Sequence, residues 1–89
     1  MKEVRLEWLP GTSILQIFPY YKHTHIAELR KNKLKYWEHG DLPTWTLHPV
    51  SINDDVIYEY FGEKFYNKTC HGFDTVDEFR NWLKEKECL

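Results

Sequence analysis

The residues best suited to chemistry in this 89-residue chain are five histidines and two cysteines. His23 and His25 form an H-x-H pair, and their rings share one face if the segment is extended. A zinc site needs three or four converging ligands, usually from recognisable local pairs. The other candidate ligands lack such spacing: His39, His48, Cys70 and His71. We therefore expect neither a metal nor any other cofactor.

Cys70 and His71, followed by Asp74, could serve as a nucleophile, a base and a group that orients the base. A thiolate near a helix N-terminus is stabilised, and the last predicted helix begins in this region. Asp74 and Asp77 oppose that thiolate, and triad members usually meet through the fold rather than as sequence neighbours. No G-x-S-x-G, H-E-x-x-H or P-loop motif occurs. We predict a protein that acts without catalysis.

Both cysteines are expected to be free thiols. Cys70 should lie just before the last helix and Cys88 at its far end, about 18–20 Å away along the axis. A disulfide requires α-carbons within about 7 Å. The first residues, MKEVRLEWLP, contain no apolar leader, and no apolar run is long enough to span a membrane. We expect a cytoplasmic protein without membrane contacts.

Residues 20–37 interleave aromatic and basic side chains, a combination suited to single-stranded nucleic acid. Its rings could stack on bases and its lysines could contact phosphates: Tyr20, Tyr21, Trp37, Lys33 and Lys35. The net charge of −2 and the scarcity of arginine oppose this function. Binding of single-stranded nucleic acid through residues 20–37 is therefore the alternative hypothesis.

Aromatic residues make up 17% of the chain, more than a core of this size requires. Tyrosine and tryptophan dominate the hot spots of protein interfaces. Residues 53–89 carry nine acidic and five basic side chains, which could occupy a surface meant for phosphates. The residues expected to contact a partner are Tyr20, Tyr21, Lys33, Lys35, Trp37, Trp45, Asp54, Asp55, Glu59 and Glu63.

The leading hypothesis is a small non-enzymatic protein-binding module, an accessory or inhibitor of a larger protein or nucleoprotein. Small chains without catalytic motifs are common among phage and mobile-element accessory proteins, which suggests an anti-defence or host-takeover role. Pairing of two copies through a sheet edge stays open.

Hydrophobic periodicity predicts the elements that carry these residues. VRLEWL (4–9) alternates and ILQIFPY (14–20) is an apolar run, so they predict a hairpin. For residues 24–38 we favour a short helix from Thr24 to Lys31 and then a strand over 33–38, because IAELRK is rich in helix formers. Two other interpretations stay open. One is a helix that continues past Lys31, whose apolar spacing Lys33 interrupts, and the other is a hairpin in which HIAEL and LKYWE flank the turn RKNK.

The middle of the chain predicts further strands. Residues 39–44 have the composition of a loop. Residues 45–50 form a predicted edge strand, because Pro49 cannot donate a ladder hydrogen bond. DVIYEYFGEKFYNKTC (55–70) predicts a second hairpin that turns at Gly62-Glu63.

FDTVDEFRNWLKEKE predicts a C-terminal helix. Asp74 or Thr75 is the N-cap, Glu78 completes a capping box, and Phe79 and Leu83 belong to the apolar stripe. Together these elements predict one compact α+β domain over residues 1–89. It consists of a small antiparallel sheet of about four to six strands with a C-terminal amphipathic helix packed on one face.

Overall fold

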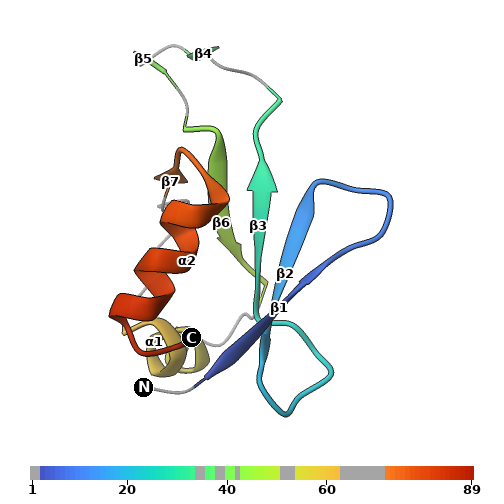
Figure 1. Cartoon of the computed structure of the whole chain (residues 1–89), viewed down its shortest axis with the longest axis vertical. Coiled ribbons are helices and arrows are strands. Elements are labelled where there is room, and N and C mark those ends of the chain that lie inside the picture. The colour runs from blue at the N-terminus through green and yellow to red at the C-terminus, as the bar shows by residue number, and fades with distance from the viewer. Residues whose placement is uncertain (1–2, 34–35, 38–39, 42, 51–53, 63–71) are drawn as a thin grey trace.

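The structure, a computed structural model, describes residues 3–33, 36–37, 40–41, 43–50, 54–62 and 72–89. In this part of the chain a five-stranded antiparallel sheet has the order β1-β2-β3-β6-β7 (Figure 1). Its strands are β1 (Val4–Trp8), β2 (Ile14–Pro19), β3 (Ala27–Lys31), β6 (Trp45–Pro49) and β7 (Gly72–Phe73).

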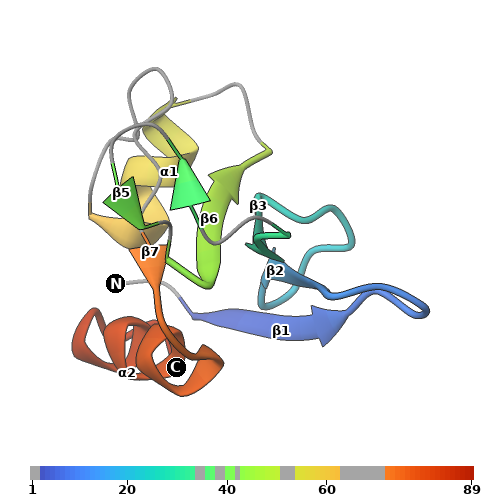
Figure 2. The same ribbon diagram turned by 90° about the horizontal axis from the view of Figure 1, so that it is seen from above.

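Two helices and a small second sheet complete the described elements. The helices are α1 (Asp54–Phe61) and α2 (Val76–Glu85), and the second sheet pairs β4 (Tyr36–Trp37) with β5 (Gly40–Asp41). Figure 2 shows both helices on the same side of the main sheet. The predicted α+β class is confirmed, including an antiparallel sheet and a C-terminal helix packed on one face.

The predicted hairpin at the N-terminus is confirmed as β1 and β2. Leu6 lies opposite Ile17 and faces the helices, whereas Arg5 lies opposite Phe18 on the other face. This alternation follows from the two-residue period of a strand. The apolar positions therefore build the core, and every second residue of β1 and β2 faces away from it.

The predicted C-terminal helix is confirmed as α2. Thr75 is the N-cap, and its hydroxyl accepts a hydrogen bond from the Glu78 amide at 3.1 Å. The Glu78 carboxylate in turn accepts from the Asp74 amide at 2.9 Å, so the capping box is formed. Phe79 and Leu83 are fully buried against the sheet.

The favoured helix from Thr24 to Lys31 is wrong, because residues 27–31 form strand β3. Ala27 and Leu29 alternate toward the core and lie between β2 and β6, where a strand satisfies the backbone groups on both sides. The hairpin interpretation overlaps β3 at residues 27–29, but it places a turn on residues 30–31 and gives the strand the wrong partner, since β3 pairs with β2 and β6. Within the described residues of the region predicted as a strand at 33–38, Tyr36–Trp37 form β4, and within those of the expected loop at 39–44, Gly40–Asp41 form β5.

The predicted hairpin over 55–70 is wrong where the structure describes it, because residues 54–61 form α1. Ile57, Tyr60 and Phe61 are buried at the i, i+3, i+4 spacing of a helix face. Gly62 has a φ of 70°, and its amide donates to the Tyr58 carbonyl at 2.7 Å. This hydrogen bond to the residue four positions earlier continues the helical pattern, so Gly62 ends a helix here and does not start a hairpin turn. Residues 63–70 lie outside the described part of the chain.

Strand β6 is not an edge strand as predicted, because it lies between β3 and β7. Pro49 is tolerated there because the Val50 amide, and not the proline nitrogen, faces β3; it donates to the Ile26 carbonyl at 2.8 Å. Pairing with β7 is confined to Trp45 and Thr46 at the other end of β6. No helix in the described residues is long and apolar enough to cross a membrane.

Candidate partner-binding surface

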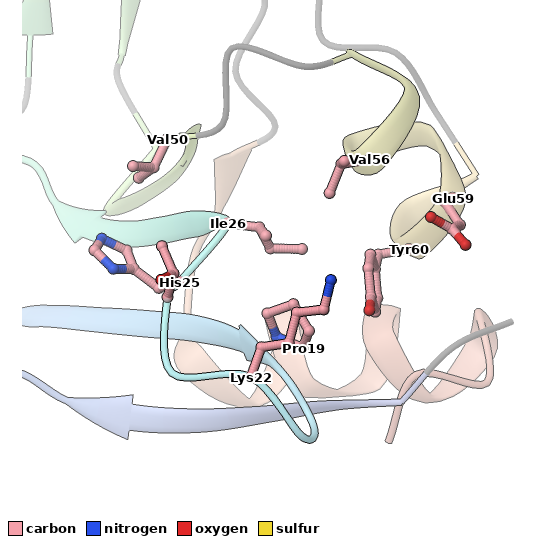
Figure 3. A pocket seen from close by; sticks show the side chains of 9 residues that line it. Pro19, Lys22, His25, Ile26, Val50, Val56, Glu59 and Tyr60 are labelled. Atoms are coloured by element: carbon pink, nitrogen blue, oxygen red, sulfur yellow. The ribbon is translucent and has the colours of Figure 1, made fainter.

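A groove of about 320 Å³ lies between the β2–β3 loop (residues 20–26) and helix α1 (Figure 3). Its walls are partly apolar and partly polar. The lining residues are Pro19, Ile26, Val50, Val56 and Tyr60 together with Lys22, Thr24, His25 and Glu59. The groove exists because α1 packs on the core through Ile57 and Phe61 and leaves Val56 and Glu59 turned toward the loop.

Arg5 holds the β2–β3 loop in place. Its Nη1 donates hydrogen bonds to the carbonyls of Pro19, Tyr20 and Lys22 at 3.2, 3.0 and 2.7 Å. The Arg5 Nε also lies 3.3 Å from a Glu7 carboxylate oxygen. The Nη1 group has two N–H bonds, so at least one of them is shared between two of these carbonyls. The shape of the loop therefore depends on a residue of β1.

Phe18 anchors the same loop on the sheet face that α1 and α2 leave uncovered. The Arg5 guanidinium lies 4.4 Å from the Phe18 ring centroid, and the His25 ring lies 5.6 Å away. These two groups leave Phe18 only 8% exposed. His25 is itself held by Glu28, with 2.9 Å between its Nε2 and the Glu28 Oε1. Both ends of the loop are thus fixed to the sheet.

Tyr20 and Tyr21 project from this loop into solvent. They are 48% and 88% exposed, and their rings meet edge to face with centroids 4.8 Å apart. They lie in sequence between Pro19 and Lys22, which both line the groove. The structure therefore places two exposed tyrosines beside a partly apolar groove.

The polar residues of the uncovered sheet face form a short network. Arg30 Nη2 lies 2.7 Å from the Glu28 Oε2, and Thr46 Oγ1 lies 2.8 Å from His48 Nε2. Burial tends to raise the pKa of Glu28, but hydrogen bonds from Arg30 and His25 and their charges outweigh it, so this pKa is lowered. Burial lowers the pKa of His48, and the positive charge of Arg30 lowers it further.

The structure separates the two halves of the segment 20–37. Tyr20 and Tyr21 lie before β3, whereas the exposed Lys33 lies beyond its other end, after Lys31. A five-residue strand spans roughly 16 Å, so these tyrosines and Lys33 do not form one continuous surface. Lys35 lies outside the described residues.

Tyr20 and Tyr21 instead lie at the same end of the sheet as two of the acidic residues that we expect to contact a partner, Asp55 and Glu59. Glu59 lines the groove, and Asp55 lies one helical turn earlier on the same side of α1. Asp54 is the first residue of α1, and Trp37 belongs to β4. Glu63 lies outside the described residues.

Trp45 lies elsewhere and packs inward. It is half-buried against the core, and its ring meets Trp8 edge to face with centroids 5.9 Å apart. Trp8 is 48% exposed and was not among the predicted contact residues. Tyr58 was not among them either; it is 53% exposed, but its place on the helix turns it away from Val56 and the groove.

The residues considered as metal ligands or catalytic groups lie apart from one another wherever the structure describes them. His25 and His48 belong to the separate pairs with Glu28 and Thr46, and no three His, Cys, Asp or Glu residues of the described ranges converge on a metal position. Cys88 is a buried free thiol whose Sγ donates to the Tyr60 carbonyl at 2.9 Å.

Burial raises the pKa of the Cys88 thiol, which makes it a structural group rather than a nucleophile. His23 lies in the exposed part of the β2–β3 loop. His39, Cys70 and His71 lie outside the described residues.

Comparison with known proteins identifies no relative: no protein-family model, no curated protein and no solved structure matches the chain.

Proposed function

We propose that this protein is a small non-enzymatic protein-binding module whose contact surface is the β2–β3 loop with the adjoining groove. The observation that carries the proposal is the pair of exposed tyrosines, Tyr20 and Tyr21, on a loop fixed from beneath by Arg5. We name this region, residues 19–26 with the groove-facing side of α1, the loop–helix surface.

The loop–helix surface has the features of a binding hot spot. Tyrosine contributes a large contact area with few rotatable bonds, which keeps the entropy cost of binding low. The three carbonyl contacts of Arg5 hold the loop before a partner arrives, and such preorganisation increases affinity. The groove beside the tyrosines can take an apolar group of the partner.

The finer form of the proposal is an inhibitor or accessory protein of a larger protein or nucleoprotein in the cytoplasm, of the kind used by phages and mobile elements. The acidic side of α1, with Asp55 and Glu59 exposed next to the groove, supports a basic or phosphate-binding surface as its target. Single-stranded nucleic acid is the less favoured partner, because Tyr20 and Tyr21 are separated from Lys33 by the length of β3.

The test is affinity capture from the source cell's lysate with the tagged full chain, with and without nuclease. We expect a protein partner that survives nuclease and that binds the Tyr21→Ala variant at least about tenfold more weakly, as for a hot-spot residue. Tyr58→Ala is the matched control, because it removes a similarly exposed tyrosine from the side of α1 that faces away from the groove.

Two outcomes would contradict the proposal. Loss of every captured protein after nuclease would favour nucleic acid. Equal capture by the Tyr21→Ala and Tyr58→Ala variants would show that the partner binds another surface.

A further inference from the structure

The described lining of the groove includes one ammonium group, that of Lys22, beside several apolar side chains. The Lys22 side chain extends between Ile26 and Tyr60 (Figure 3). Among the described residues, the Lys22 ammonium has neither an ion pair nor a side-chain hydrogen bond. Lys22 is an exposed residue, so its ammonium is accessible to an anion from solvent, and the apolar side chains beside it limit the screening water on one side only. The groove therefore offers a position for an anion at the Lys22 end.

The remaining walls favour an aliphatic group. Pro19 and Ile26 form the side next to the sheet, and Val50 and Val56 stand opposite Lys22 in Figure 3. Val50 is 42% exposed, so an apolar ligand could still cover it. The volume of about 320 Å³ is near the lower limit of small-ligand pockets, so it suits one residue of a partner rather than a long segment.

Glu59 restricts where the anion can lie. It stands on the α1 wall beyond Tyr60, on the far side of the groove from the loop (Figure 3). A carboxylate repels a second anion and accepts hydrogen bonds from N–H groups. The anion therefore belongs at the Lys22 end, and a backbone amide of the ligand suits the Glu59 end.

We infer that the groove binds the C-terminal residue of a partner protein when that residue is aliphatic, an inference that rests on the proposed protein-binding function. The α-carboxylate pairs with Lys22, the side chain lies against Val50 and Val56, and the backbone amide is directed toward Glu59. A terminal residue carries all three groups on one α-carbon, as the size of the groove requires. Capture of a terminal carboxylate is a recurring mode of peptide recognition.

The experiment uses the ¹⁵N-labelled full chain and four acetylated peptides. They are Gly-Ser-Gly-Leu with a free carboxylate, the same peptide as a C-terminal amide, Gly-Ser-Gly-Gly with a free carboxylate, and Gly-Ser-Leu-Glu as an amide. Chemical-shift changes at residues 20–26 and in α1 measure each Kd. We expect the first peptide to bind at least about tenfold more tightly than each of the others, the gain typical of a hydrogen bond to a charged group.

Equal binding of the leucine acid and its amide would overturn the inference. Tight binding of the Gly-Ser-Leu-Glu amide would overturn it in favour of an internal acidic residue. These comparisons use the unmodified protein, so they do not depend on whether any variant folds.

Two variants test the role of Lys22. Lys22→Met keeps an unbranched side chain of similar length and should remove the difference between the acid and the amide. Lys31→Met, at the far end of β3, should preserve it. Preserved discrimination in Lys22→Met would overturn the inference.

Failure of this inference and failure of the proposed function give different results. The inference alone fails if no peptide binds while lysate capture still depends on Tyr21. The proposed function fails if lysate capture does not depend on Tyr21, whatever the peptides do.

Discussion

On the face of the main sheet that the helices cover, β2 buries Leu15 and Ile17 in a continuous apolar core. On the opposite face the same strand carries Phe18, which is covered by the side chains of Arg5 and His25 instead of by a helix. The covered face is stabilised by the removal of apolar surface from water, which is large and non-directional. The uncovered face uses directional contacts, each of which fixes the position of one group.

The two faces of the same strands therefore have different roles, one in stability and one in positioning the loop. Burial under α1 and α2 supplies most of the stability, whereas the contacts of Arg5 and Glu28 on the other face set the course of the β2–β3 loop. Changes on the covered face should therefore alter global stability. Changes on the uncovered face should alter the loop more than the fold.

The largest effect is expected from Phe79→Ala on the covered face. Phe79 is fully buried, and its ring packs 5.3 Å from Phe73 and 6.1 Å from Trp82, measured between centroids. Truncation should lower the free energy of unfolding by about 3–5 kcal/mol, because it leaves a cavity in the core. Urea denaturation followed by tryptophan fluorescence measures the change.

Tyr21→Ala is the control for Phe79→Ala. Tyr21 is 88% exposed, so its removal should change the free energy of unfolding by no more than about 0.5 kcal/mol. Similar losses in the two variants would contradict the division between a stabilising core and a projecting loop.

An intermediate effect is expected from Arg5→Lys. Lysine keeps the charge but is shorter than arginine and lacks the planar group that lies over Phe18, so the loop loses hydrogen bonds worth about 1–2 kcal/mol in total. Amide hydrogen exchange should accelerate at residues 20–26 and change little in α2.

Arg30→Lys tests whether this effect is specific to Arg5. Arg30 pairs with Glu28 on the same face and is about half exposed, so this change should cost less than about 1 kcal/mol. It should leave exchange in the loop as it is. Unchanged amide exchange at residues 20–26 in Arg5→Lys would disprove the role of Arg5 in holding the loop.

The smallest effect is a loss of stability on acidification. The pKa of His48 is lowered from its ordinary value of 6.5, so the folded state binds this proton less readily than the unfolded state, and stability falls as the pH drops below 6.5. The pKa of Glu28 is lowered from 4.5, so its contribution is complete above pH 4.5 and is lost below it.

The variants Glu28→Gln and His48→Gln divide this pH dependence between the two groups. Glu28→Gln should flatten the part below pH 4.5, and His48→Gln should flatten the part just below pH 6.5. Thermal melts from pH 3 to 8 measure both, on the order of 1 kcal/mol or less for partly solvated groups. A wild-type Tm that rises on acidification would reverse the sign and refute both assignments.

Local signals were sufficient for two parts of the fold. The β1–β2 hairpin follows from alternation between apolar and polar residues, and α2 follows from the capping box of Thr75 and Glu78 with the stripe that contains Phe79. In both, the deciding interactions join residues close in sequence. Such interactions can be identified without knowledge of the chain's path.

The sequence of helix α1 contains local signals for a helix, but its strand-favouring residues outweighed them in the prediction. Asp54 and Asp55 at its start, the spacing of Ile57 and Phe61, and Gly62 after its end are all typical of a helix. The β-branched and aromatic residues between them favoured a strand instead. Burial of one helical face against the sheet decided the outcome.

Strand β3 shows the opposite case. Residues 26–31 have good helix propensity, but Ala27 and Leu29 occupy the centre of the sheet between β2 and β6. Helix propensity amounts to tenths of a kcal/mol per residue, whereas pairing on both sides satisfies the whole backbone of the segment. Only the tertiary structure could resolve that competition.

The sequence by itself determined that this chain builds an α+β fold with a capped C-terminal helix and carries more aromatic residues than its core needs. Only the tertiary structure decided that Arg5 binds carbonyls 14–17 residues away and that Lys22 enters a groove formed with α1. Periodicity and capping act within a few residues along the chain. The hydrogen bonds of Arg5 to the loop and the walls of the groove join segments that become neighbours only when the sheet and helices pack together.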